Sequence, residues 1–310
     1  MEKKEIEMFQ DKNILVTGGT GSIGSELVKQ LLKFKCKQIR IFSRDESKHF
    51  FLERDIRRLN SKIDIKYLIG DIRDRDRLSM ALRNVDIVFH TAALKHVPYC
   101  EYNPFEAIKT NIQGTQNLIN LAIDMNISRV VAISTDKAVY PNTIMGVTKL
   151  LMERMIISTK SYIGPSITKF AVVRFGNVLS TRGSVVPTWI EQIQNGGPVT
   201  VTSKSMKRYF MSVFEAVNLI LLATTMMLGQ EIFVLKMKEK KIYDLALETI
   251  RNYSKKKKVK IKIIGPRDRE KMREQLYTKE ERKFMLDLGK FYIIQPSQTL
   301  LKNRKRLYKI

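Results

Sequence analysis

The stretch Thr17-Gly18-Gly19-Thr20-Gly21-Ser22-Ile23-Gly24 ends a short apolar run and opens a helical pattern over residues 23–34. Its glycines at positions 18, 21 and 24 permit a tight turn and a close backbone approach to a pyrophosphate, whose charge the amides at the helix N-terminus would meet. A second apolar run, Gln38–Phe42, and the acidic residue Asp45 follow at a suitable distance. Residues 13–45 therefore predict a strand–loop–helix–strand unit that holds NAD(P).

The same alternation of short apolar runs and amphipathic stretches continues through the first half of the chain. Predicted strands are Ile14–Thr17, Gln38–Phe42, Ile65–Ile69, Val85–His90, Val130–Ser134 and Ala171–Arg174, and predicted helices cover residues 23–34, 46–60, 74–83, 104–125 and 146–160. Strands that alternate with helices indicate right-handed crossovers and a parallel sheet covered on both faces. We expect an α/β fold, with a Rossmann-like doubly wound parallel sheet in a domain of residues 1–176.

Residues 177–310 are less regular and predict a smaller substrate-binding lobe that is interleaved with the first domain. Expected elements are a helix around Trp189, a strand at Val199–Thr202, a helix at Phe214–Met227, a strand at Glu231–Leu235, a helix at Ile242–Asn252 and a strand near residues 259–263. From Phe291 onward the pattern gives no clear signal, and we expect part of that stretch to be loosely packed.

The composition is that of a globular protein, with 310 residues of which 44% are hydrophobic. No stretch approaches the ~20 apolar residues that a membrane-spanning helix needs, and the N-terminus lacks the apolar region of a signal peptide. Cys36 and Cys100 give neither a disulfide framework nor metal-ligand spacing. We expect a cytoplasmic protein without a metal site.

The charge is strongly positive, because 56 Lys and Arg residues face 31 Asp and Glu residues, a net +25. Such a balance is compatible with nucleic acid, an anionic membrane surface or acidic substrates. The one cluster, Lys255–Lys258, is followed by Val259, Ile261 and Ile263 alternating with lysines, the period of a half-buried strand. Because no aromatic residues interleave with the cluster, a solvated strand edge is favoured over a nucleic-acid patch.

The residues that determine specificity for NAD or NADP follow the second predicted strand and are Ser43-Arg44-Asp45. A carboxylate there favours a free ribose 2′-hydroxyl, whereas an arginine can grip a 2′-phosphate through two hydrogen bonds. Arg44 therefore favours NADP. Asp71-Ile72, after the third strand, would flank the adenine, and Thr91-Ala92-Ala93, after the fourth, would line the pyrophosphate and ribose.

The fifth predicted strand ends in Ile133-Ser134-Thr135-Asp136-Lys137, at the edge where open parallel sheets bind ligands. Dehydrogenase families with this glycine spacing place Ser or Thr there and Tyr-x-x-x-Lys on the next helix. The lysine holds the nicotinamide ribose and lowers the pKa of the tyrosine. In Met145-Gly146-Val147-Thr148-Lys149 the lysine is present, and Met145 occupies the tyrosine position.

The chain at this point resembles the extended short-chain dehydrogenases/reductases, and within them the UDP-N-acetylglucosamine 4,6-dehydratases of capsule and flagellin-glycan biosynthesis. The stretches that carry the resemblance, from residue 13 to about 190, are TGGTGSIG, FSRDE, GDIRD, AALKHVP, NPFEAIKTNIQGTQNLI, STDKAVYP, MGVTK, VRFGNV and RGSVVP. The C-terminal part matches more thinly, through Lys207–Ser212 and Arg267–Lys271. The Asp-Lys pair in STDKA is the most specific element, since relatives acting on dTDP-glucose carry Asp-Glu there.

The resemblance implies a redox-neutral reaction that uses tightly bound NADP. The C4 hydroxyl of the sugar is oxidised, H5 and the 6-hydroxyl leave as water, and the hydride returns to C6. Lys137 would handle the C5 proton, Asp136 the leaving hydroxyl, Thr135 the 4-oxygen, and Lys149 the nicotinamide ribose. Neighbouring opposite charges suit proton transfer in a cleft. The product would be a UDP-4-keto-6-deoxy-HexNAc for surface glycans, and inversion at C5 is favoured.

The binding residues that the resemblance implies form two sets. Those for the cofactor are Gly18, Thr20, Gly21, Ser22, Ile23, Gly24, Ser43, Arg44, Asp45, Asp71, Ile72, Thr91, Ala92, Lys95, Met145, Lys149 and Val178. Those for the UDP-sugar are Lys95, Asn177, Arg182, Arg208, Arg267 and Glu270. Arginines suit a diphosphate because each offers a planar fork. His90 is expected to be a core or supporting residue, and His96 is given no role.

Met145 departs from the family pattern, because a thioether cannot accept the 4-hydroxyl proton. Lys137, Asp136 or a water could replace the tyrosine, and Tyr140 is a further candidate. A UDP-sugar epimerase of the same family and a catalytically inactive Rossmann protein that binds nucleic acid stay open as alternatives. For the favoured dehydratase we expect a UDP-sugar partner, no nucleic acid, no membrane insertion and a homo-oligomer.

Overall fold

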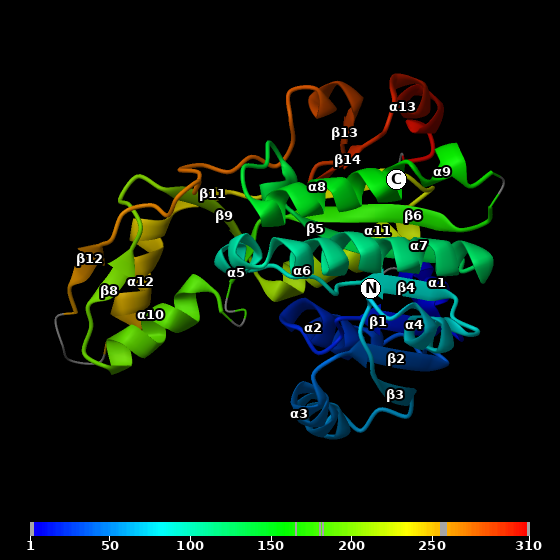
Figure 1. Ribbon diagram of the computed structural model, residues 1–310, viewed down its shortest axis with the longest axis horizontal. Coiled ribbons are helices and arrows are strands. Elements are labelled where there is room, and N and C mark those ends of the chain that lie inside the picture. Colours follow the sequence, from blue (N-terminus) through cyan, green and yellow to red (C-terminus); the bar gives the residue numbers. More distant parts are fainter. Residues whose placement is uncertain (1–2, 165, 180, 182, 255–258, 309–310) are drawn as a thin grey trace.

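The computed structural model describes residues 3–308 apart from 165, 180, 182 and 255–258. A nine-stranded sheet lies at its centre (Figure 1), in the order β13-β14-β10-β6-β5-β4-β1-β2-β3. Its strands are β1 (Asn13–Thr17), β2 (Gln38–Ser43), β3 (Asp64–Ile69), β4 (Ile87–His90), β5 (Arg129–Thr135), β6 (Lys169–Phe175), β10 (Glu231–Leu235), β13 (Met285–Asp287) and β14 (Phe291–Ile294). Neighbours from β3 to β10 pair parallel, and β14 pairs antiparallel with β10 and β13.

The strands β4, β5 and β6 are almost completely buried, as expected for the middle of a parallel sheet covered on both faces. All six strands predicted for the first half are confirmed, each to within two residues at either end. The α/β, doubly wound fold is likewise confirmed. Three strands that come after residue 176 also join this sheet, so the main layer draws on both halves of the chain.

Helices cover both faces of the sheet. Buried side chains of α1 (Lys3–Phe9), α2 (Ser22–Leu31), α3 (Glu46–Arg57) and α11 (Val213–Met226) pack in the core of one face. Those of α4 (Arg75–Leu82), α7 (Gly114–Asp124) and α8 (Ile144–Ile157) pack in the core of the other. The helix predicted over 104–125 consists of α6 (Pro104–Ile108), a π-helical turn (Lys109–Gln113) and α7, with α5 (Val97–Tyr102) before it and α9 (Thr159–Tyr162) following α8.

A second lobe lies at one end of the sheet, on the left in Figure 1. It contains β7 (Asn177–Val178), β8 (Val199–Val201), β9 (Lys207–Met211), β11 (Glu239–Lys241), β12 (Ile261–Ile263), α10 (Val185–Gln194) and α12 (Ile242–Tyr253). Trp189 is buried in its own small core and donates Nε1–H to the backbone oxygen of Thr200 at 2.7 Å. The expected lysine-flanked strand is β12. Ile263 is exposed, because among the described strands β12 pairs with β8 alone. The Lys255–Lys258 cluster lies outside the described residues.

The expectation that part of the stretch from Phe291 onward is loosely packed is wrong for residues 291–308, the described part of that stretch. Residues Phe291–Ile294 form β14, and α13 (Gln298–Arg304) follows it. The buried Arg304 donates to Glu231 Oε1 at 2.9 Å, and the Tyr308 hydroxyl donates to the same oxygen at 2.6 Å. Because these contacts join residues far apart in the chain, the local sequence pattern does not indicate them. Within the described part of the chain, every helix is too short or too polar to cross a bilayer.

Candidate active site

The glycine loop connects β1 to α2 and leaves no room for a side chain at Gly18 or Gly24. Gly18 has a φ of +65°, and a Cβ there would lie 2.7 Å from backbone atoms of Ala92. A Cβ on Gly24 would lie 2.6 Å from the carbonyl oxygen of Gly18. The backbone therefore comes close to the end of β4, and the first amides of α2 face the space in front of the loop, as a bound diphosphate requires.

One cavity of about 850 Å³ lies between the carboxyl ends of the central strands and the second lobe. Of the residues predicted from sequence, those that line it are Gly18, Thr20, Gly21, Ser22, Ile23, Gly24, Ser43, Arg44, Asp71, Ile72, Thr91, Ala92, Lys95, Thr135, Lys137, Met145, Lys149, Asn177, Val178, Arg208, Arg267 and Glu270. Ser134 Oγ and Thr110 Oγ1 line it as well, buried and without a hydrogen-bond partner among the described residues. The cradle and these hydroxyls fit a dinucleotide.

The predicted adenosine end of the cavity is built from the ends of β2 and β3. Thr20 Oγ1 and Ser43 Oγ lie 2.7 Å apart, and Arg44 Nη1 lies 3.4 Å from Asp71 Oδ2. Asp45 does not line the cavity and instead accepts the amide of Lys48 at 3.0 Å, so that it caps α3. Lys48 lines the cavity, as Arg44 does, and its ammonium forms an ion pair with Asp45. Lys48 was not predicted as a site residue, although it lies three residues after Asp45, the residue that caps α3.

The end of β5 places three of the predicted catalytic side chains in consecutive positions. Asp136 is fully buried and does not line the cavity, in contrast to the expectation that it contacts the sugar. Its Oδ1 accepts the hydroxyl of Thr135 at 2.9 Å and the ammonium of Lys137 at 3.0 Å. Its Oδ2 has no hydrogen-bond partner within the described residues. Asp136 therefore reaches the cavity only through its two neighbours.

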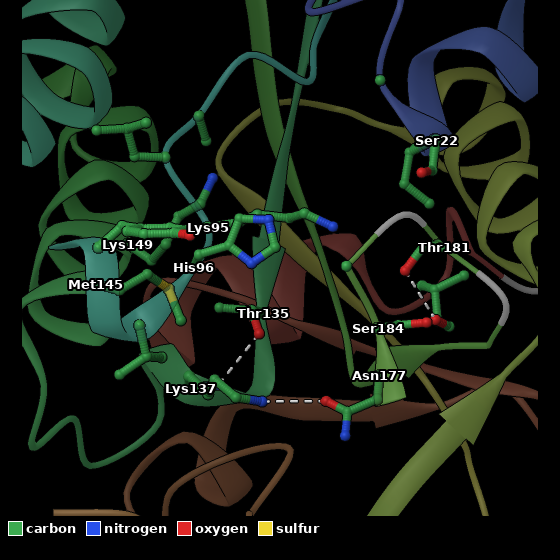
Figure 2. Close-up of a pocket in the computed structure, with 18 of the residues that line it drawn as sticks. Ser22, Lys95, His96, Thr135, Lys137, Met145, Lys149, Asn177, Thr181 and Ser184 are labelled. Atoms are coloured by element: carbon green, nitrogen blue, oxygen red, sulfur yellow. Dashed lines mark hydrogen bonds between the residues drawn. The ribbon is translucent and has the colours of Figure 1, made fainter. Parts of the chain in front are cut away.

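Lys137 extends from the end of β5 towards the second lobe, as Figure 2 shows. Its Nζ donates to Asn177 Oδ1 at 3.1 Å and lies 3.8 Å from Glu274 Oε1. Glu274 lines the cavity and is buried. Glu274 was not predicted as a site residue, because no pattern in the neighbouring sequence indicates a contact with the end of β5.

Lys149 lies on α8, beside Met145 in Figure 2. Its Nζ donates to the backbone oxygen of Ile133 at 2.7 Å. Burial lowers the pKa of Lys149 to about 8, opposed by the charge of Glu153. His90 is buried nearby, and burial together with the charge of Lys149 lowers its pKa to about 3. Both ring nitrogens of His90 contact threonine hydroxyls, so it is a neutral core residue, as expected.

The side chain at the missing tyrosine position fills space rather than supplying a polar group. Met145 is buried and packs with Cys100 and Ala107 while lining the cavity. Tyr140, the alternative base considered above, does not line the cavity. Its hydroxyl donates to Glu280 Oε2 at 3.2 Å and accepts the amide of Lys279 at 3.0 Å. The phenol is thus engaged with the C-terminal part of the chain.

The predicted nucleotide end of the cavity combines β9 with the segment after β12. Arg208 is buried, and its Nη2 lies 3.3 Å from Glu270 Oε1. The other oxygen of Glu270 accepts the amide of Arg267 at 3.1 Å. Arg182 lies outside the described residues. His96 also lines the cavity, although sequence analysis gave it no role, and the absent side chain of Gly183 leaves room for its ring.

Comparison with known families decides the classification. The family model described as "Polysaccharide biosynthesis protein" matches residues 14–296. This chain belongs to that family. Family membership confirms the resemblance to short-chain dehydrogenases/reductases, a group that includes nucleotide-sugar dehydratases and epimerases.

Similar curated proteins carry different names. A protein of Methanocaldococcus jannaschii described as an uncharacterized membrane protein is 51% identical over 93% of this chain and 87% of its own length. A UDP-glucose 4-epimerase of Rickettsia akari is 42% identical, covering 93% and 84%. A UDP-N-acetylglucosamine 4,6-dehydratase (inverting) of Campylobacter jejuni is 40% identical, covering 94% and 84%.

Solved structures agree with the fold. The structure of Pen from Bacillus thuringiensis has a TM-score of 0.89 and 44% identity, covering 93% of this chain and 90% of that one. The dTDP-glucose 4,6-dehydratase DesIV from Streptomyces venezuelae, solved with NAD and TYD bound, has a TM-score of 0.76 at 21% identity, covering 95% and 98%. At that identity DesIV supports the fold alone.

Proposed function

We propose that this family member is a UDP-N-acetylglucosamine 4,6-dehydratase that uses tightly bound NADP. The observation that carries the proposal is the end of β5, where Thr135 and Lys137 face the same cavity as the glycine loop. Elimination of water across C5 and C6 needs a proton acceptor and a proton donor close together, and Lys137 and Asp136 lie 3.0 Å apart. The Campylobacter jejuni relative is named for this reaction.

A nicotinamide cofactor would be held by the glycine loop, Lys95 and Lys149, and it would supply the hydride acceptor and donor for the sugar. NADP rather than NAD is proposed because Arg44 and Lys48 both line the adenosine end. Two cations there suit a 2′-phosphate. The nicotinamide ribose would meet Lys149, whose burial on α8 fixes its position.

Lys137 is proposed to remove the C5 proton, because its Nζ is the basic group that projects into the cavity from β5. Asp136 is proposed to return a proton to the leaving 6-hydroxyl through Thr135, since the Thr135 hydroxyl already lies 2.9 Å from Asp136 Oδ1. In that relay the protonated carboxyl donates to Thr135 Oγ1, and the threonine passes its own proton to the sugar oxygen. Because Met145 lacks a proton acceptor, Thr135 would orient the 4-hydroxyl and Lys137 would accept its proton, which Lys137 would pass to water before it removes the C5 proton.

The UDP part would lie across the second lobe, with Lys95 and Asn177 near the sugar. Arg208 and Arg267 would bind the diphosphate or uracil, and Glu270 a ribose hydroxyl. Arg208 is already held at the cavity by Glu270, which reduces the side-chain entropy that binding costs. The product would be a UDP-4-keto-6-deoxy-HexNAc, with inversion at C5 favoured.

A cytoplasmic homo-oligomer is part of the proposal. Tyr102, Phe105 and Ile108 on α5 and α6 are exposed, as is Leu151 on α8. Exposed large apolar side chains on adjacent helices are typical of an association surface.

A UDP-hexose 4-epimerase is the second candidate, because the Rickettsia akari relative carries that name. Incubation of the purified protein with UDP-N-acetylglucosamine in heavy water separates the two. A dehydratase gives a product that lacks one water and carries solvent deuterium at C5, whereas an epimerase gives an isomer with its 6-hydroxyl intact and no deuterium. If neither product forms and the protein binds RNA at physiological salt, both enzyme proposals fail.

The variant Lys137→Met tests the assigned proton acceptor. We expect the rate of C5 deuterium incorporation to fall by about 10²–10⁴-fold, the usual loss on removing a positioned base. Bound NADP(H), measured by absorbance after gel filtration, should be unchanged. A variant that exchanges the C5 proton at the wild-type rate would exclude Lys137 as the base.

A further inference from the structure

The segment from Gly265 to Glu281, named here the strap, connects the nucleotide end of the cavity to the catalytic strand end. It carries the proposed UDP residues Arg267 and Glu270 at its beginning and Glu274 in its middle. At its far end, Glu281 forms a buried ion pair with Arg174 of β6 at 2.9 Å. The strap therefore crosses from the second lobe to the main sheet.

Side-chain contacts bind the strap to the turn that follows Lys137. Lys271 Nζ donates to the backbone oxygen of Val139 at 2.8 Å, and Asn142 Nδ2 donates to the backbone oxygen of Arg269 at 2.6 Å. Both contacts lie within a few residues of the catalytic lysine. The strap is thus fixed against the part of the chain that sets the position of Lys137.

Glu274 is the strap residue that comes nearest to Lys137. Its Oε1 lies 3.8 Å from Lys137 Nζ, and its Oε2 lies 3.6 Å from Lys271 Nζ. The Glu274 side chain is only 5% exposed, and Oε2 has no hydrogen-bond partner in the described ranges. Burying a carboxylate is costly unless nearby cations compensate it, so its presence here needs an explanation.

The charges around Lys137 alternate in sign. Asp136, Lys137, Glu274 and Lys271 follow one another at distances of 3.0, 3.8 and 3.6 Å. An ammonium group has three donors, and Lys137 has three oxygens around it, from the end of β5, from Asn177 of β7 and from the strap. Two of these oxygens accept hydrogen bonds at 3.0 and 3.1 Å, and the carboxylate of Glu274, at 3.8 Å, attracts the ammonium from the third side.

We propose that Glu274 is a positioning residue for Lys137, through which the strap that holds the nucleotide also sets the position and charge state of the catalytic lysine. The role of Lys137 in this statement rests on the proposed function. In this proposal Glu274 acts on the reaction through Lys137.

Chemical labelling of Lys137 tests the proposal without a substrate. Cofactor-loaded full-length protein is acylated with acetic anhydride at pH 8, and the Lys137 and Lys66 peptides are quantified by mass spectrometry. Glu274→Gln removes a negative charge, which favours the neutral, reactive amine, and should speed Lys137 labelling by about threefold or more. Lys271→Met removes the competing cation and should slow it. Labelling of Lys66 on β3 should be the same in all variants. Glu280→Gln is the control variant, because Glu280 lies on the same strap but contacts Tyr140, and it should leave Lys137 labelling unchanged.

Turnover gives the second readout. With UDP-N-acetylglucosamine, Glu274→Gln should lower kcat by about tenfold while KM stays within about twofold, because the displacement of Lys137 outweighs its larger neutral fraction. Unchanged Lys137 labelling in both Glu274→Gln and Lys271→Met would overturn the proposal. If the wild type forms no product, the proposed function fails, whereas the labelling result still decides the role of Glu274. If Glu274→Gln does not fold, the opposite-signed effect of Lys271→Met decides it.

Discussion

The glycine loop and the strap line the same cavity, but the protein holds them in place by different means. The loop is fixed by backbone packing, because Gly18 and Gly24 leave no space for a Cβ. The strap has little regular secondary structure and is fixed by side chains, above all by the buried pair of Arg174 and Glu281. The cofactor end is therefore sensitive to added atoms, and the substrate end to lost charges.

The largest effect is expected where the backbone packs most closely. Gly18→Ala places a Cβ 2.7 Å from Ala92 at a φ of +65° and should abolish retention of NADP(H) on gel filtration. Gly164→Ala is the matched control, because Gly164 has a φ of +64° but no atom within 4 Å of the added Cβ. Equal loss of the cofactor from both variants would show that strain from the positive φ, rather than close packing against Ala92, causes the effect of Gly18→Ala.

The strap should respond to removal of its buried cation. Arg174→Met leaves the carboxylates of Glu153 and Glu281 buried without their partner, and should lower the free energy of unfolding by about 3–5 kcal/mol. Lys236→Met breaks the exposed pair with Asp287 and should cost less than about 1 kcal/mol. Denaturant unfolding of both variants measures the difference. Equal costs would show that the strap does not depend on this buried pair.

Lys149 combines features of the glycine loop and of the strap, because it lines the cofactor part of the cavity and carries a buried charge. Its pKa is lowered from 10.5 to about 8, so the unfolded chain holds this proton more tightly and stability rises between pH 8 and 10.5. Below pH 8 the buried charge costs about 3 kcal/mol. Cofactor-free Lys149→Met should therefore gain stability relative to wild type below pH 8, and the gain should shrink as the pH approaches 10.5. Parallel curves of Tm against pH would contradict this.

The smallest effect is expected at the adenosine end, which solvent reaches. Arg44→Ala removes a half-exposed guanidinium that lies 3.4 Å from Asp71. Arg44→Ala should weaken NADP binding by about tenfold, which corresponds to the loss of one hydrogen bond to a charged group. It should change NAD binding by no more than about twofold. Titration calorimetry on cofactor-free protein measures both affinities. Equal losses for the two dinucleotides would remove the argument for NADP.

The same contrast explains how much the sequence could predict. The glycine loop, the six strands of the first half and the placement of Lys137 at a strand end depend on residues close together in the chain. The burial of Asp136 depends on Gly176, where a Cβ would lie 2.8 Å from Tyr209 Cβ, and hence on the approach of β9. The contact of Glu274 with Lys137 likewise joins distant segments. Neither leaves a local pattern.

The position of β14 has a consequence for synthesis on the ribosome. The strands that carry the glycine loop and Lys137 emerge early, whereas the partner of one edge of β10 emerges only with Phe291–Ile294. Until then the nascent chain exposes an unpaired strand edge, and the carboxylate of Glu231 lacks its ion pair with Arg304. Such an edge invites intermolecular pairing and aggregation. The edge of β10 is therefore open to such pairing until Phe291–Ile294 has been made.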